Sequence, residues 1–507
     1  MIFDLSVPGG LMGALVPDII LMVGAMVLML VAAWGPESAS RQRTVGFGSL
    51  AVLAVTIIAV LVYAGQGATA GPGIIAVDGF RWASDLVFLI GAAATIGIGI
   101  ESNPRDRFLS AESHVLVLFA TAGMMILAAA RDLMIVFLGV ELMSIAVYVL
   151  VGINRSSVRS AEAALKYFLL GAFSTGFLLY GIALIYGATG TTSLPVIGER
   201  IAHFALGGHG MLLIGVGLLL VGFAFKIAAV PFHMWAPDVY EGAPTPITAY
   251  MAAAVKAAAF AMFFRLWIES FTLIDGAWLA PIWWIAAATM VAGNVIAIAQ
   301  RNIKRMLAYS SIVHGGYLLV AVVAGTSLGS AAFLFYAVAY SLATFGAFAV
   351  VSAMTRPGVH ATLISDYDGL WTTRPWLAVG FGVCMLALLG FPIFGGAGFF
   401  AKWYVLQAAI ASNNDLLPLA VILVLTSLVS AGYYLHVVRV MFMRPRPENA
   451  PEPAPLAPLT RIVLVGSVTL LLALGLFPQP LISWARTNAA VTAPEARDPF
   501  PIAPTLR

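Results

Sequence analysis

The sequence predicts an all-α polytopic membrane protein with fourteen transmembrane helices, two inverted five-helix repeats (helices 4–8 and 9–13), and breaks in helices 7 and 12. Composition, apolar runs and a repeated motif lead to this prediction. The 507 residues are 61% hydrophobic and only 10% charged, whereas soluble domains carry about 25% charged residues. This excludes a soluble enzyme and a nucleic-acid-binding protein, which would be rich in charge.

Fourteen runs are apolar enough to span a membrane, because about 20 residues are needed to cross about 30 Å of hydrocarbon. They cover residues 11–34, 45–65, 85–100, 114–130, 133–152, 163–187, 211–236, 247–269, 279–300, 306–324, 331–354, 376–410, 416–440 and 461–482. The third and fourth runs are short but end at clear polar breaks. The longest polar stretches, 66–84, 188–210, 355–375 and 441–460, are predicted to be loops rather than domains.

The runs divide into four segments. Residues 1–113 form an N-terminal three-helix segment, 114–269 the first five-helix repeat, 279–440 the second, and 461–507 the last helix with a C-terminal tail. Alternate loops contain 15 lysines and arginines on one side and 3 on the other. Since basic loops face the cytoplasm, both termini are predicted to lie outside. Asp4 and the lack of a basic N-terminal region argue against a cleaved signal peptide.

The evidence for a repeat is a pair of matching strings. The seventh run contains Gly222 to Lys226 and the twelfth Gly398 to Lys402, both GFxxK and 176 residues apart. The strings that begin at Tyr148 and Tyr317 also match, 169 residues apart. A repeat unit with an odd number of helices must be inverted in the membrane, and inverted repeats with discontinuous helices are typical of secondary transporters.

Both GFxxK helices are predicted to be broken. Pro231 follows Lys226 closely, and a proline strains the preceding turn. The twelfth run is too long for one straight span and contains Pro392, Gly395 and Gly396. A mid-membrane break frees backbone carbonyls, which only a buried or water-filled site can satisfy. The alternative is a simple proline kink.

Four ionisable side chains lie near the middle of predicted spans, where each costs from about 2.5 to above 10 kcal/mol. They are Glu141, Lys226, Lys256 and Lys402. Lysine and glutamate can exchange protons when burial shifts their pKa values, so the set predicts a proton relay. We expect Glu141 to pair with Lys226, and Lys256 to connect this pair to Lys402. The alternative for Glu141 and Lys226 is a structural ion pair that only fixes helix register.

Three histidines are further candidates for proton transfer, namely His233, His314 and His436. Each could instead be a packing histidine, and His233 could cap the broken helix. Lys166 and Arg265 lie near helix ends, where long basic side chains reach the interface; Lys166 could also pair with Glu162 one turn earlier.

No metal or cofactor site is predicted. Cys384 is the only cysteine, which excludes an intrachain disulfide, an iron–sulfur cluster or a cysteine-based zinc site. No pair of histidines has haem or metal spacing, and no P-loop motif is present. The driving energy must therefore come from an ion gradient or from partner subunits.

Three strings resemble the antiporter-like membrane subunits of respiratory complex I, the bacterial proton-pumping NADH:quinone oxidoreductase. They are Gly139 to Ser144, Ala164 to Phe173, and the stretch from Phe225 to Pro246. The resemblance covers essentially the whole chain. Lysine at 402 favours complex I over the Mrp-type cation/proton antiporters, since one Mrp subunit, like subunit M of complex I, usually has glutamate there. An Mrp-type antiporter subunit is the alternative function.

The resemblance implies a role for each residue. Glu141 matches the acidic residue of the fifth helix, Lys226 the lysine of the broken seventh, Lys256 the connecting residue of the eighth, and Lys402 the terminal lysine of the broken twelfth. It also implies a bacterial inner membrane location beside a second antiporter-like subunit, small membrane subunits and lipid. NAD, FMN, iron–sulfur clusters and quinone would bind in other subunits, and quinone reduction there would supply the energy.

Overall fold

The computed structural model describes residues 11–34, 38–66, 73–106, 108–355, 361–392, 396–412, 415–448 and 455–489. In these residues the chain is helical, and its β-pairings are three isolated bridges. Twelve of the described helices are long and apolar enough to cross a membrane. The predicted class, a polytopic all-α membrane protein, is therefore confirmed.

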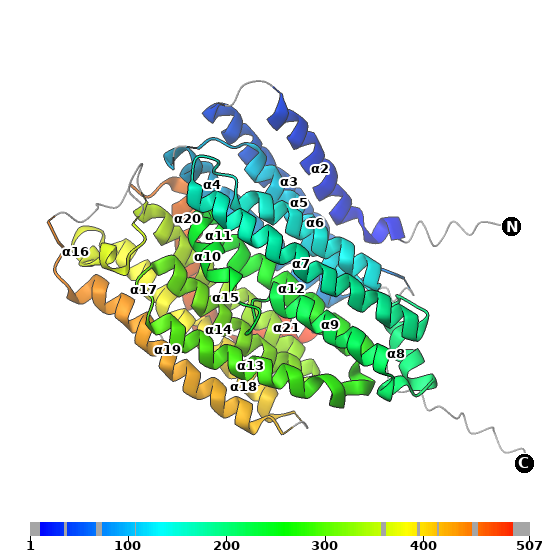
Figure 1. Cartoon of the computed structure of the whole chain (residues 1–507). Coiled ribbons are helices and arrows are strands. Elements are labelled where there is room, and N and C mark those ends of the chain that lie inside the picture. Colours follow the sequence, from blue (N-terminus) through cyan, green and yellow to red (C-terminus); the bar gives the residue numbers. More distant parts are fainter. Residues whose placement is uncertain are drawn as a thin grey trace, which may run out of the picture.

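The helices, drawn in Figure 1, are α2 (Val16–Ala33), α3 (Ala39–Gly65), α4 (Gly79–Arg105), α5 (Glu112–Ala129), α6 (Leu133–Val151), α7 (Val158–Thr189), α8 (Leu194–His203), α9 (Gly210–Lys226), α10 (Trp235–Gly242), α11 (Thr245–Tyr250), α12 (Lys256–Ser270), α13 (Asp275–Ile298), α14 (Ile303–Ala324), α15 (Ser327–Met354), α16 (Leu370–Thr373), α17 (Pro375–Leu389), α18 (Ala397–Ile410), α19 (Leu417–Met443), α20 (Pro458–Leu476) and α21 (Gln479–Asn488). A π-helical segment, η2 (Met251–Val255), joins α11 to α12.

The centre of the bundle is formed by the α11–η2–α12 unit, α14 and α15, whose apolar segments are almost completely buried. By contrast α2, α3, α19 and α20 bury a third or less of their apolar segments. The central helices are less hydropathic than these peripheral ones, with a mean hydropathy of 1.6–1.8 against 1.9–2.6, as expected where the outer helices face lipid. Figure 1 shows α2 and α3 along one edge of the bundle and α19 along another. The ionisable side chains on α12 and α14 are thus placed far from the lipid-facing surface.

The seventh and twelfth apolar runs are each divided into two helices. Lys226 is the last residue of α9, and α10 begins only at Trp235. Helix α17 ends at Leu389, and α18 begins at Ala397. Lys226 therefore precedes its break, whereas Lys402 follows its break and lies in the second half-helix. Pro231, Pro392 and Gly396 lie within the breaks, and Gly395 is outside the described residues.

Some predicted boundaries are wrong. The 188–210 stretch contains the ten-residue helix α8 rather than only loop. The fourteenth run ends at Leu476, and a separate helix α21 follows. Helix α4 begins at Gly79, six residues before the predicted span, because Asp78 caps it by accepting a hydrogen bond from the Arg81 backbone N–H. Apolar runs mark hydrocarbon crossing, whereas helices continue wherever caps and local hydrogen bonds support them.

The two halves of the twelfth run approach each other closely, so we expect Gly398→Ala to be destabilising. A Cβ atom at Gly398 would lie 1.9 Å from the backbone oxygen of Ala387 in α17. The helices would have to separate, at a cost of about 1–3 kcal/mol. Gly432→Ala in α19 is the control, because its Cβ would meet nothing within 4 Å. Equal thermal inactivation midpoints for the two variants in detergent would contradict the close approach.

Candidate functional site

A line of polar side chains runs along α14 through the buried centre. Ser311, His314 and Tyr317 are spaced three residues apart and are all buried. Side chains at this spacing lie on neighbouring positions of one helix face. Helix α14 packs against both α12 and α18, the helices that carry Lys256 and Lys402. It is therefore the element that joins these two lysines.

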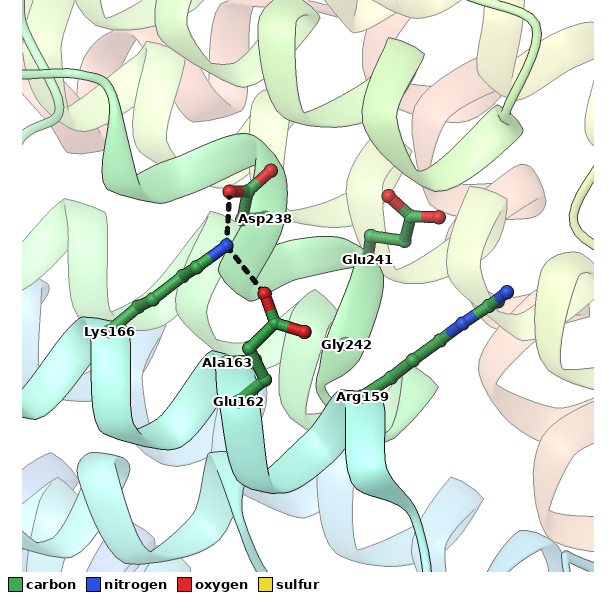
Figure 2. A pocket seen from close by; sticks show the side chains of 7 residues that line it. All are labelled: Arg159, Glu162, Ala163, Lys166, Asp238, Glu241 and Gly242. Atoms are coloured by element: carbon green, nitrogen blue, oxygen red, sulfur yellow. Dashed lines mark hydrogen bonds and ion pairs between the residues drawn. The ribbon is translucent and has the colours of Figure 1, made fainter.

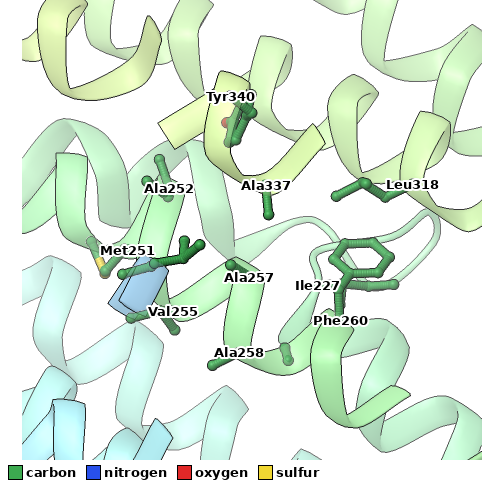
Figure 3. Packing of buried hydrophobic residues seen from close by; sticks show 14 of the residues in the cluster. Ile227, Met251, Ala252, Val255, Ala257, Ala258, Phe260, Leu318, Ala337 and Tyr340 are labelled. Carbon is green, nitrogen blue, oxygen red and sulfur yellow. The ribbon is translucent and has the colours of Figure 1, made fainter. Parts of the chain in front are cut away.

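Lys256 lies at one end of this line. It follows the π-helical segment η2 directly, and such segments are frequent at functional sites. Its ammonium donates hydrogen bonds to the backbone oxygen and to the hydroxyl oxygen of Ser311, both at 2.5 Å. Figure 3 shows apolar side chains such as Val255 and Phe260 around this segment. In the described part of the chain Lys256 has no carboxylate partner, so neutral oxygens alone hold its ammonium group.

His314 occupies the middle of the line among tyrosines. Its Nδ1 lies 2.5 Å from the Tyr336 hydroxyl, and its Nε2 lies 3.1 Å from the Tyr434 hydroxyl. The Tyr434 hydroxyl also contacts the hydroxyl of Ser310. Both ring nitrogens therefore face groups that can donate or accept a proton. These tyrosines could not be identified from the sequence, because they come from α15 and α19 and match no motif.

Lys402 lies at the other end of the line, 8% exposed. Its ammonium donates to the backbone oxygen of Leu389, at 2.8 Å. Leu389 is the last residue of α17, so the lysine satisfies a carbonyl that the helix break frees. The ammonium also lies 4.8 Å from the centre of the Tyr317 ring, within range of a cation–π interaction.

Lys226 forms a separate cluster with α6. Its ammonium donates to the Ser144 hydroxyl at 2.8 Å and to the Tyr148 hydroxyl at 3.2 Å. A different group satisfies a backbone oxygen beside this break, since the Trp235 indole N–H donates a hydrogen bond to the Phe225 backbone oxygen at 3.0 Å. Tyr148 thus contacts Lys226, and Tyr317 contacts Lys402. These two tyrosines begin the two matching strings of the sequence.

The predicted ion pair between Glu141 and Lys226 is not formed in this structure. Lys226 reaches the level of Ser144, one turn along α6 from Glu141, and binds neutral hydroxyls there. One Glu141 oxygen, Oε1, is buried without a hydrogen-bond partner. Glu141 itself is half-buried on the outer face of α6, where Leu138 and Ile145 are more than half exposed. Its side chain is therefore directed toward the edge of the protein rather than toward the central line.

The other histidine candidates lie away from the central line. His233 lies within the break between α9 and α10, is half-buried, and has an Nδ1 atom without a hydrogen-bond partner. His436 is half-buried on α19 and contacts the Arg439 guanidinium at 3.2 Å. The structure thus brings only His314 together with the buried lysines.

A network of ion pairs holds α10 at the basic-loop side (Figure 2). Asp238 of α10 bridges Lys166 of α7, at 3.0 Å, and Arg305 of α14, at 2.7 Å. Lys166 also pairs with Glu162, as the sequence indicated. The half-helix after the break is therefore tied to two neighbouring helices.

The prediction that Arg265 extends to the membrane interface is wrong. Its side chain is fully buried and forms ion pairs with Asp78 at 2.8 Å and Glu269 at 2.9 Å. A second buried set joins Arg81 to Asp18 at 2.5 Å and to Asp85 at 3.5 Å. Of these carboxylates only Asp78 lies outside the predicted spans, as the N-cap of α4, whereas Asp85 and Glu269 are the end residues of predicted spans and Asp18 lies within the first one.

We expect Arg265→Met to destabilise the protein strongly, because it removes the ion pair of Asp78 and one of the two ion pairs of the buried Glu269. Breaking a buried pair in this way costs about 3–5 kcal/mol. Arg131→Met is the matched control, since Arg131 also pairs with Glu269 but is 28% exposed. Heat inactivation of the solubilised protein measures both variants, and a smaller loss for Arg265→Met than for Arg131→Met would contradict the assignment.

Comparison with known proteins gives consistent matches. The family model described as "NADH:quinone oxidoreductase/Mrp antiporter, TM" matches residues 130–430. NADH-quinone oxidoreductase subunit N of Gemmatimonas aurantiaca is 49% identical over 98% of this chain and 97% of its own length. The subunit of the same name from Trichlorobacter lovleyi is 42% identical over 94% of this chain and 96% of its own.

Solved structures share the fold. A chain of respiratory complex I from Thermus thermophilus is 36% identical, with a TM-score of 0.80 over 93% of this chain and all of that chain. A chain of the Mrp complex from Dietzia sp. has a TM-score of 0.81 over 94% of this chain and 97% of that chain, but is only 22% identical. The Mrp likeness is therefore one of fold.

Proposed function

This chain belongs to the family of subunit N of NADH-quinone oxidoreductase, and we propose that it translocates protons within that complex through its buried lysines. The observation that carries the proposal is the line of buried polar side chains on α14, between Lys256 and Lys402. Lys256 bonds Ser311, His314 follows one turn later, and the Tyr317 ring lies against Lys402. A lysine bonded only by neutral oxygens can release its proton, because no carboxylate holds the charge in place.

The relay begins at Glu141 and Lys226 and passes to Lys256 at the break. A Cβ atom built on Gly315 would lie 3.4 Å from the backbone oxygen of Ile227, the residue after Lys226, and 3.9 Å from the Lys256 ammonium. The broken helix and Lys256 thus meet around one glycine of α14. From Lys256 the proton passes by way of Ser311, His314 and its tyrosines to Lys402. His233 and His436 serve at the two ends of the relay.

The membrane topology that we propose has fourteen spans, which counts α9–α10 and α17–α18 as one broken span each. The contacts of Tyr148 with Lys226 and of Tyr317 with Lys402 support two inverted repeats, residues 114–269 and 279–440. Residues 1–113 precede them as a three-helix segment, and 461–507 follow. The basic loops face the cytoplasm, and both termini lie on the periplasmic side of the bacterial inner membrane.

The outer face of α6 is the proposed contact with another membrane subunit. A carboxylate among exposed apolar side chains is costly in lipid, so a partner that covers Glu141 and supplies a polar group would stabilise it. A neighbouring antiporter-like subunit, small membrane subunits and lipid complete the surroundings. The redox cofactors NAD, FMN, iron–sulfur clusters and quinone are assigned to other subunits, and this chain takes no catalytic part in electron transfer.

Mild-detergent extraction of the tagged chain from its native membrane tests the proposal. We expect the chain to migrate in a large complex that has NADH:quinone reductase activity. Migration with other membrane proteins but without this activity would favour the alternative, an Mrp-type cation/proton antiporter, and Na⁺/H⁺ exchange would then be the assay.

A further inference from the structure

His114 is a buried histidine that the relay does not use. It lies in the first turn of α5 and is 2% exposed. Its Nε2 atom is buried and has no hydrogen-bond partner in the protein. A buried polar atom without a partner costs about 1–3 kcal/mol, so such an atom needs a partner that the protein itself does not supply.

That partner can be water, because His114 borders a small cavity. The cavity has a volume of about 10 Å³ for a water-sized sphere, which is close to the space of one water molecule. Polar side chains of Thr95, Asn103 and Ser113 line it together with His114. A polar cavity of this size that contains an unpartnered nitrogen suits one ordered water.

Two further cavities adjoin this one in succession, as their shared lining residues indicate. A cavity of about 90 Å³ shares Phe108 and Pro244 with the His114 cavity. An outer cavity of about 210 Å³ shares Arg159, Glu241 and Gly242 with the middle one. Figure 2 shows the outer cavity, where the side chains of the α10 ion-pair network meet. The three cavities form a row from the basic-loop surface to His114.

On its inner side the cavity leads toward Lys256. Val117 lines the cavity, and its backbone oxygen accepts hydrogen bonds from the hydroxyls of Thr121 and Tyr250. The two hydroxyls lie 2.6 Å apart. Tyr250 ends α11, and η2 then leads directly to Lys256. The hydroxyls of Thr121 and Tyr250 are thus the proton-carrying groups beside the cavity on this side, and the apolar segment η2 separates Tyr250 from Lys256 along the chain.

We propose that this row of cavities is a proton inlet from the basic-loop side, and that His114 is the proton-transfer residue at its inner end. The inference rests on the proposed function and on its orientation. The imidazole takes up one proton at Nε2 from cavity water and releases one toward Tyr250, so that the ring returns to its neutral form.

The test uses the complete complex in inverted membrane vesicles, with proton uptake measured during NADH oxidation. We expect His114→Gln to slow uptake by about a hundredfold or more, the lower end of what a positioned proton-transfer group contributes. Glutamine fills similar space and forms hydrogen bonds but takes up no proton. Uptake by His114→Gln at the wild-type rate would overturn the proposal and leave a structural histidine.

Two glycines of α4 provide a matched pair that leaves His114 intact. A Cβ atom on Gly99, which lines the cavity, would lie 3.3 Å from the His114 ring, whereas a Cβ atom on Gly97 would meet only side chains at 3.9 Å or more. We expect Gly99→Ala to slow uptake and Gly97→Ala to leave it unchanged. Equal rates of proton uptake by the Gly99→Ala and Gly97→Ala variants would overturn the proposed inlet, even if the complex with His114→Gln fails to assemble.

Lys256→Met separates this inference from the proposed function. Loss of uptake in Lys256→Met together with normal uptake in both the His114→Gln and Gly99→Ala variants would reject only the inlet. Normal uptake in Lys256→Met would reject the relay itself.

Discussion

We expect Lys256→Arg to abolish proton uptake by the complex and Lys256→His to retain part of it. Lys256 is buried and bonded to two oxygens of Ser311. An arginine there keeps its charge at all accessible pH values, since the guanidinium does not deprotonate in proteins. Histidine is smaller but can still take up and release a proton. We expect uptake to fall by about a hundredfold or more for arginine, the usual range for removal of a proton-transfer group.

Lys166→Arg is the control for this substitution. Lys166 lies on the surface and pairs with Glu162 and Asp238, so the same change of side chain should leave uptake near the wild-type rate. Uptake is measured in inverted vesicles and divided by the amount of assembled complex. If the Lys256→Arg variant takes up protons as fast as the wild type, a fixed charge is sufficient at this position and proton release by Lys256 is not required.

The second large effect is expected for Glu141→Gln, which removes an ionisable group and keeps its size. Glu141 Oε1 is buried without a hydrogen-bond partner. The carboxylate therefore lowers the stability of the folded protein more than an uncharged glutamine would. We therefore expect the variant to be at least as stable as the wild type but unable to pump. The carboxylate changes charge by taking up a proton, whereas the amide does not.

Glu199→Gln is the matched control for Glu141→Gln, because Glu199 is an exposed carboxylate of α8 that lines none of the three cavities. Both variants are compared by proton uptake per NADH oxidised. A wild-type ratio in Glu141→Gln would remove Glu141 from the relay. Loss of pumping only when the complex fails to assemble would instead assign Glu141 to the contact between subunits.

The amino-acid sequence was sufficient to predict the apolar helices and the ionisable side chains that lie in the middle of them. The apolar runs are local properties, and twelve of them appear as long apolar helices. The breaks near Lys226 and Lys402 were also predictable, because proline and glycine act on the backbone of their own helix. The buried position of Lys256 followed from its place in the middle of an apolar run.

The hydrogen-bond and ion-pair partners of these residues, by contrast, depend on how the helices pack. Lys226 binds Ser144 rather than Glu141, because helix rotation and relative height set the contact and neither can be read from spacing. His314 contacts tyrosines from α15 and α19, which are distant in sequence. Arg265 is buried because α4 begins early enough to bring Asp78 to it. Apolar periodicity specifies depth in the membrane, but the partners of a buried polar group depend on how whole helices pack.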